Sequence, residues 1–323
     1  MPDQRAYQSP QLAGYIITAL REEHVEACCL LEGLAFSRLR EEWGQPPHPP
    51  RRADWLFHHI RSSPDNNLVA LSDGKVIGFS LTHHWGSLGW VGPIVVDPER
   101  QGIGLGRELV NRSVAVLERL NCQSIALETW PHHTLNLALY IKCGFRPGNL
   151  IFVLEKHVGE IEAHFSGQWL SHIPCPENWL DRLSALSDKI VPGLDYRPMM
   201  RYTLECQLGD VAFWEQDGEA EAAAVVHLES YSQVTSPDYA AVELLMIQPG
   251  SESRLDDLLL QLEGWAASVG RSRVRLSVPG RHAEALYHLL GERGYRLSKT
   301  RLRMAVREQD VPPEGVNFLS YAI

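Results

Sequence analysis

The amino-acid sequence carries the same series of structural signals twice, and this internal repeat most restricts how the chain can fold. An Asp-Gly pair at residues 73–74 has a counterpart at residues 217–218, an offset of 144 positions. Both pairs lie between apolar runs, a setting in which Asp-Gly predicts a tight β-hairpin. Pro98 and Pro249 come next, at an offset of 151, because the second copy has a longer hairpin connection. The chain is therefore built from two related halves.

The elements after the two prolines also recur in the same order. Each proline precedes a helical pattern of leucines, a short apolar strand, a second helix and a glycine-aromatic pair. That pair is Gly-Phe at residues 144–145 and Gly-Tyr at residues 294–295, and a last apolar strand closes each copy. This order predicts a mixed α/β sheet flanked by helices. The strands on the two sides of the first helix should be parallel, because a helical crossover joins them.

The length of 323 residues fits two domains of ordinary size. A strand over residues 15–20 and a helix over residues 21–36 are expected before the first hairpin, and residues 158–195 connect the copies. We predict two tandem domains, residues 1–165 and 166–323. Each should be an α/β (α+β) unit with a twisted mixed β-sheet flanked by helices.

Charge is divided unevenly between the halves. Residues 1–157 carry 16 acidic and 15 basic side chains, a net charge of −1, whereas residues 158–323 carry 24 and 15, a net charge of −9. An acidic second half is a poor place for a polyanion. The sequence therefore predicts no nucleic-acid partner and places any polyanionic cofactor in the first half.

The composition also argues against several classes of protein. Hydrophobic residues make up 44% and charged residues 22% of the chain, as in folded globular proteins. The start of the chain has no signal-like apolar segment, and no window approaches the roughly 18 apolar residues of a membrane span. The six cysteines show no CxxC spacing, and the adjacent histidine pairs diverge on a strand or helix. We expect a cytoplasmic protein with no membrane partner and no metal site.

The segment from residue 90 to residue 109 is the part of the sequence that most clearly indicates a binding site. An apolar strand ends at Val96, and after a proline turn the sequence Gln-Gly-Ile-Gly-Leu-Gly at residues 101–106 begins a helix. Glycines allow successive backbone N–H groups to point into one concavity, and the helix N-terminus adds partial positive charge. Such a loop binds phosphate, and Arg107 could add a donor. The run lacks the third glycine of a dinucleotide fingerprint and the Gly-Lys-Ser/Thr of a P-loop.

The run instead resembles the acetyl-CoA pyrophosphate motif of the GNAT (N-acetyltransferase) superfamily, Gln/Arg-x-x-Gly-x-Gly/Ala, with Gln101, Gly104 and Gly106 at the motif positions. For the loop alone, a glycine turn that serves only tight packing is the alternative. Residues 138–145, Ala-Leu-Tyr-Ile-Lys-Cys-Gly-Phe, add a second similarity, to the family's Ala-x-Tyr-x-Lys-x-Gly-Phe helix end. The chain resembles tandem GNAT proteins in which one copy is degenerate.

The resemblance covers residues 13–156 by motif and residues 200–308 mainly by architecture. It implies that the strand before the loop diverges from its neighbour and that acetyl-CoA lies in the gap. In the family an asparagine contacts the pantetheine arm of the cofactor. His133 stands at that position here, so the contact is assigned to Asn136. The implied cofactor contacts come from this strand, the loop and the later helix: Ile94, Val95, Val96, Gln101, Gly102, Ile103, Gly104, Leu105, Gly106, Arg107 and Asn136.

Transfer of an acetyl group to an amine needs a neutral amine, a polarised thioester carbonyl and a proton for the departing thiolate. The resemblance places Tyr140 at the family's general-acid position, and a tyrosine that only packs is the alternative. Glu128, near the end of the strand at residues 124–130, is our first candidate for the base. His83, His84 or a chain of water molecules are the alternatives.

The second copy lacks the residues that would hold the cofactor. At the offset of the two prolines, the counterparts of the three motif residues are Glu252, Leu255 and Asp257. Carboxylates repel a diphosphate, and the leucine adds bulk. We therefore predict that acetyl-CoA binds only in the first half.

Together these signals predict an acyl-CoA N-acyltransferase (EC 2.3.1 class). Its acetyltransferase activity would move an acetyl group from acetyl-CoA directly to the amine of a small molecule or peptide. The alternative is a catalytically silent acetyl-CoA-binding sensor or partner-binding module, but Tyr140 beside an intact loop favours the enzyme. His132, His133 and the tryptophans of the first half indicate a partly aromatic acceptor pocket, and a homodimer is left open.

Overall fold

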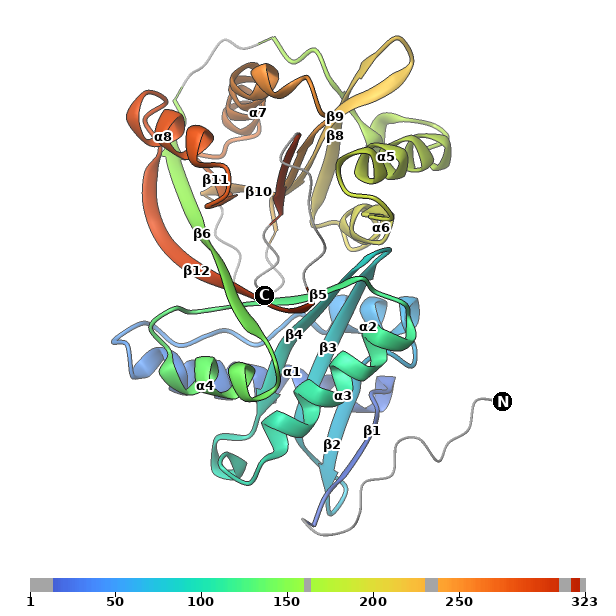
Figure 1. Cartoon of the computed structure of the whole chain (residues 1–323), viewed down its shortest axis with the longest axis vertical. Helices are drawn as coiled ribbons and strands as arrows, with labels where there is room; N and C mark the ends of the chain where they lie inside the picture. Colours follow the sequence, from blue (N-terminus) through green and yellow to red (C-terminus); the bar gives the residue numbers. More distant parts are fainter. Residues whose placement is uncertain (1–13, 160–163, 230–237, 308–314, 320–323) are drawn as a thin grey trace.

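The computed structural model describes residues 14–159, 164–229, 238–307 and 315–319. Two α/β units, one from each half of the sequence, share a continuous 13-stranded mixed sheet, as Figure 1 shows. The expected fold class, a tandem pair of mixed sheets flanked by helices, is confirmed. No helix in these ranges has both the length and the apolar character of a membrane span.

Over residues 14–159, the first half supplies six strands and four α-helices. In chain order they are β1 (Ile16–Ala19), α1 (Val25–Glu41), α2 (Ala53–Ser62), β2 (Leu68–Ser72), β3 (Lys75–Trp85), β4 (Leu88–Val96), α3 (Leu105–Arg119), β5 (Ser124–Thr129), α4 (Thr134–Lys142) and β6 (Arg146–His157). Helices α1 and α2 cover one face of the sheet through side chains such as Val25 and Trp55, and α3 covers the other through Leu105 and Leu109.

The second half repeats this order of strands and α-helices and adds β13 at its end. Its elements are β7 (Gln168–Trp169), α5 (Glu177–Ile190), α6 (Arg197–Glu205), β8 (Gly209–Gln216), β9 (Glu219–His227), β10 (Tyr239–Ile247), α7 (Leu255–Ser268), β11 (Arg273–Pro279), α8 (Ala283–Gly291), β12 (Arg296–Arg307) and β13 (Val316–Leu319).

Both predicted hairpins form where the Asp-Gly pairs stand. Asp73 and Gly74 between β2 and β3 have φ of 50° and 75°, and Asp217 and Gly218 between β8 and β9 have φ of 53° and 81°. Two consecutive residues at positive φ are what a type I′ turn requires. The predicted parallel pairs are also present, β4 with β5 and β10 with β11.

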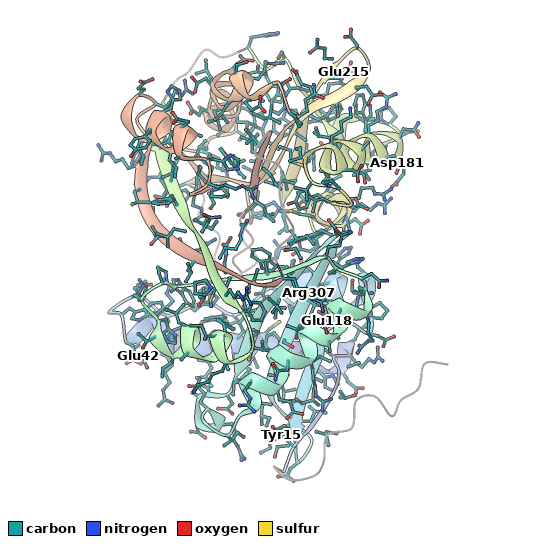
Figure 2. The ribbon with its side chains drawn as sticks, in the orientation of Figure 1. Tyr15, Glu42, Glu118, Asp181, Glu215 and Arg307 are labelled. Atoms are coloured by element: carbon teal, nitrogen blue, oxygen red, sulfur yellow. The ribbon has the colours of Figure 1, made fainter. Side chains whose placement is uncertain are left out.

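The closing strands of the two copies are exchanged. The sheet order is β1-β2-β3-β4-β5-β12-β6-β11-β10-β9-β8-β7. Strand β12 of the second copy therefore pairs with β5 of the first copy, and β6 of the first copy pairs with β11 of the second. Figure 1 shows β6 in green and β12 in red side by side between the units. Arg307 at the end of β12 donates to Glu118 of α3 over 2.8 Å, and both are labelled in Figure 2.

This exchange joins the two halves through backbone hydrogen bonds as well as side chains. Leu154 of β6 faces Leu276 of β11 in the ladder, and Met304 of β12 faces Leu127 of β5. We keep residues 1–165 and 166–323 as the proposed division of the chain. Within the continuous sheet, β12 nevertheless pairs with β5 and β6 pairs with β11, so each copy contributes a strand to the other side of that boundary.

Candidate active site

A gap opens between β4 and β5 in the first half. The two strands pair only from Leu88 to Trp90 on β4, and Trp90 with Ala126 is the last pair. Beyond it β4 continues to Val96 along β3, while β5 pairs with β12 instead. The β5-facing edge of residues 94–96 therefore has no ladder partner in the described part of the chain.

The three β4 residues predicted to contact the cofactor stand at this gap. Ile94 and Val96 are half-buried, and Val95 is buried against the core beneath α1 and α2. They face Ser80, Phe79 and Gly78 of β3 on the other edge. Backbone groups on the free edge are available to a ligand that lies along the strand.

The glycine loop lies at the end of the gap. Gly102 has φ of 85° and Gly104, the N-cap of α3, has φ of 91°, and a Cβ added at either would meet no atom within 4 Å. Only glycine adopts such a backbone without strain. Within the described residues, the N–H groups of residues 102–107 make no hydrogen bond to the protein. They are free to donate to phosphate oxygens, and the helix dipole supports that use.

The side chains around the loop divide into anchors and solvent-facing groups. Leu105 is buried and fixes the start of α3, whereas Gln101, Ile103 and Arg107 are exposed. A Cβ on Gly106 would lie 3.6 Å from Leu139 of α4, which is ordinary contact. The concave side of the loop is therefore lined by backbone rather than by bulky side chains.

A cavity of about 710 Å³ joins the gap to the second half. Its first-half wall comes from β4, the end of β5, α4, and the segment from α1 to α2, with Phe36 and Trp43 among its aromatic side chains. Its second-half wall comes from one face of the sheet formed by β10, β11, β6 and β12. The volume suits a small organic molecule or a short peptide end.

Tyr140 of α4 lines this cavity. The side chain is 8% exposed, and its ring packs edge-on against Phe145 with 6.0 Å between ring centroids. Burial raises the pKa of the Tyr140 phenol well above its usual range, so the group stays protonated at neutral pH. Its hydroxyl has no hydrogen-bond partner among the described residues. Tyr140 thus offers a proton inside the cavity.

Glu128 also lines the cavity, but its carboxylate is held by two arginines of the second copy. Its side chain is fully buried, with Arg303 Nη2 at 2.7 Å from Oε1 and Arg301 Nη1 at 3.6 Å from Oε2. Arg303 also donates to the carbonyl of Leu319. The strand exchange brings these arginines to β5, a relationship that sequence patterns did not reveal.

The two histidines considered as alternative bases lie elsewhere. His83 and His84 belong to β3, and the cavity is lined by other residues. His83 is buried, and its Nε2 lies 3.1 Å from the carbonyl oxygen of Gly92. Burial lowers the pKa of His83 well below its usual range, and the neighbouring His59 ring lowers it further.

His133, which stands at the family's asparagine position, and Asn136 lie together at the first turn of α4. His133 is the N-cap, and its Nδ1 accepts a hydrogen bond from the backbone N–H of Asn136 over 3.2 Å. Asn136 itself lines the cavity, as does His132, whose ring packs edge-on against Trp43 at 4.7 Å. Trp90 and Trp130 line the cavity as well, so its wall is partly aromatic.

In the second half the corresponding gap is filled by the protein itself. β10 pairs with β11 only over residues 239–242, and residues 244–247 pair antiparallel with β13. At the loop position, Glu252 Oε1 accepts hydrogen bonds from the N–H groups of Gly250, at 3.1 Å, and Gly315, at 2.6 Å. Leu255 is packed in the core. Backbone and carboxylate thus occupy the places that are open in the first half.

No arrangement of three or more His, Cys, Asp or Glu side chains suited to a metal ion occurs in the four described ranges.

Comparison with known proteins identifies the first half. Residues 31–145 match the model of the Acetyltransferase (GNAT) family. None of the curated proteins matches the sequence. The first half therefore carries a GNAT domain, whose family transfers acyl groups from acyl-CoA.

Solved structures share the fold over nearly the whole chain. A candidate acetyltransferase from Pyrococcus horikoshii is 16% identical, with a TM-score of 0.69 and coverage of 98% of both chains. A GCN5-related N-acetyltransferase from Sphaerobacter thermophilus is 15% identical, with a TM-score of 0.58 and coverage of 94% of this chain and 99% of the other. A tandem GNAT protein from the clavulanic acid biosynthesis pathway is 14% identical, with a TM-score of 0.57 and coverage of 92% and 100%.

Proposed function

We propose that this protein is an N-acetyltransferase that moves an acetyl group from acetyl-CoA directly to the amine of a small molecule or peptide. One observation carries the proposal: the open edge of β4 leads from a loop of unpaired N–H groups to a cavity that is lined by Ile94 and the protonated Tyr140. Such a run suits a long ligand with a phosphate end and a reactive end.

Acetyl-CoA is proposed to bind with its pyrophosphate on the N–H groups of residues 102–106. Its pantetheine arm would follow the β4 edge at residues 94–96 and reach Asn136, which places the thioester beside Tyr140. The second half would bind none, because β13 and Glu252 fill the corresponding places. This assignment makes the second half a wall of the acceptor cavity.

The reaction then needs three proton and charge movements. The amine nitrogen attacks the thioester carbonyl carbon, and backbone N–H groups of the β4 edge near Val95 and Val96 stabilise the negative oxygen that forms. The C–S bond breaks as Tyr140 donates its proton to the sulfur. The amine loses one proton, for which we propose Glu128 as the acceptor, with Arg301 and Arg303 fixing its carboxylate at the cavity wall.

Release of free CoA thiol from acetyl-CoA, measured with a panel of primary amines, tests this function. The proposal expects amine-dependent thiol release together with an acetylated product of matching mass. Tight binding of acetyl-CoA without turnover of any amine would instead support a silent sensor.

A further inference from the structure

The second-half wall of the cavity carries an unusual set of charges. Arg275 of β11 lies beside Glu155 of β6 in the ladder, and on β12 Lys299 pairs with Val153 and Arg301 with Ile151. Arg275, Lys299 and Arg301 all line the cavity. Three cationic side chains therefore stand on one face of neighbouring strands, in the half of the chain that is otherwise acidic.

Most ionic groups around them are already paired. Arg301 lies 3.6 Å from Glu128, which Arg303 also holds. Glu155 accepts a hydrogen bond from the Tyr239 hydroxyl over 3.0 Å. By contrast, neither Arg275 nor Lys299 makes a hydrogen bond or ion pair with a residue that the structure describes, and the Arg275 guanidinium lies over the Tyr239 ring at 5.2 Å.

The surroundings of Lys299 show that its charge is poorly compensated. Enclosure by the cavity wall, with Arg301 and Arg275 nearby, lowers the pKa of Lys299 to about 8, although Glu155 and Glu243 act in the opposite direction. Burial raises the pKa of Glu243, a carboxylate on this wall without a hydrogen bond or ion pair in the described ranges, which favours its neutral form. Lys299 is exposed in the cavity, and the like charges of Arg301 and Arg275 near it repel its charge, so an anionic ligand would offset that repulsion.

We propose that the acceptor carries, besides its amine, an anionic oxygen group, a carboxylate or a phosphate, that binds between Arg275 and Lys299 on the second-half wall. The inference rests on the proposed function, because it assigns the cavity to the acceptor. The degenerate copy would then recognise the acceptor, and amines that carry no anionic group would be poor substrates.

A binding experiment tests the anion site without relying on turnover. Protein saturated with CoA, so that the glycine loop is occupied, is titrated by calorimetry with succinate and with inorganic phosphate. We expect one saturable site for at least one of these anions. Arg275→Gln and Lys299→Gln should each weaken that binding by about 10- to 100-fold, as loss of a charge-assisted hydrogen bond does. Lys189→Gln on α5, where the lysine pairs with Glu219, should bind as wild type does.

The Tm of each variant shows whether weaker anion binding comes from a destabilised protein. Removing an unpaired cation should not lower Tm. Absence of saturable binding of both anions, or equal binding by wild type and the Arg275→Gln/Lys299→Gln double variant, would overturn the site.

Turnover then separates the two proposals. The KM of ω-amino acids is compared with the KM of their amides. In the same way, the KM of aminoalkyl phosphates is compared with the KM of the matching amino alcohols. The pair with the larger difference in KM shows whether the site prefers a carboxylate or a phosphate. We expect the charged member of a pair to have the lower KM, and the Arg275→Gln and Lys299→Gln variants to raise that KM toward the value of the uncharged member. Equal KM values within every pair would contradict the anion site and leave the acetyltransferase intact. Anion binding that depends on Arg275 and Lys299, without turnover of any amine, would contradict the acetyltransferase alone.

Discussion

Leu245 of β10 and Phe318 of β13 face each other in an antiparallel ladder. At the repeat offset of 151 residues, Leu245 corresponds to Ile94, which stands on the open edge of β4. The same strand position is thus closed by the chain in one copy and open in the other. This difference, more than any single loop residue, supports our proposal that the cofactor binds in the first half.

Replacing Tyr140 by Phe tests whether its hydroxyl is the proton donor. The ring keeps its packing on Phe145, so stability and the KM for acetyl-CoA should barely change. Loss of a general acid should lower kcat by about 10²–10⁴-fold. Steady-state kinetics give the answer, with Tyr287→Phe, at an exposed tyrosine of α8 in the second half, as control. A kcat within about threefold of wild type, less than about 0.7 kcal/mol, would remove Tyr140 from the mechanism.

Glu128→Gln separates a catalytic carboxylate from a purely structural ion pair. Both roles predict a lower Tm, since Arg303 and Arg301 lose a buried anionic partner, at a cost on the order of 3 kcal/mol. Only the catalytic role predicts a large loss of kcat well below the unfolding temperature, with a changed pH profile. Glu118→Gln removes the partner of Arg307, another cross-half pair but exposed, and should alter neither kcat nor the pH profile. A destabilised Glu128→Gln enzyme with normal kcat would show that Glu128 is not the base, and a water molecule would then accept the proton from the amine.

The free energy of unfolding should fall as the pH is lowered from about 6.5 to about 4. Burial lowers the pKa of His227 to about 3 and that of His59 to about 4, whereas both titrate near 6.5 in the unfolded chain. In this window the unfolded chain binds more protons than the folded one, so the free energy of unfolding drops as pH falls. Each histidine contributes a slope of up to about 1.4 kcal/mol per pH unit.

Urea unfolding at several pH values measures this slope, and His227→Gln should make it shallower by one histidine's contribution. An unchanged slope in that variant would show that His227 is not buried in its neutral form.

The features that the sequence predicted well depend on neighbouring residues. Asp73 with Gly74 fixes a hairpin because two residues at positive φ are needed there. The glycine loop was recognisable because Gly102 and Gly104 adopt a backbone that other residues disfavour. The helical crossover in each copy implied a parallel strand pair, and the structure contains both pairs.

The features that escaped prediction depend on which strands become neighbours. Leu154 and Met304 lie in apolar strands that would fit either copy, since alternation along a strand fixes its faces but not its partner. The exchange of β6 and β12 and the insertion of β13 were therefore unforeseen. Because the exchange supplies Arg301 and Arg303 to Glu128, the ion pairing of the candidate base was unforeseen too.

The most direct test of the account is a calorimetric titration of acetyl-CoA into the wild-type protein and two matched variants. Gly104 and Gly250 have nearly equal φ, 91° and 89°, and open space at the Cβ position, so Gly104→Asp and Gly250→Asp introduce the same strain and charge in the two copies. We predict one site per chain, lost in Gly104→Asp and unchanged in Gly250→Asp. Two sites in the wild type, or equal binding by both variants, would contradict the account.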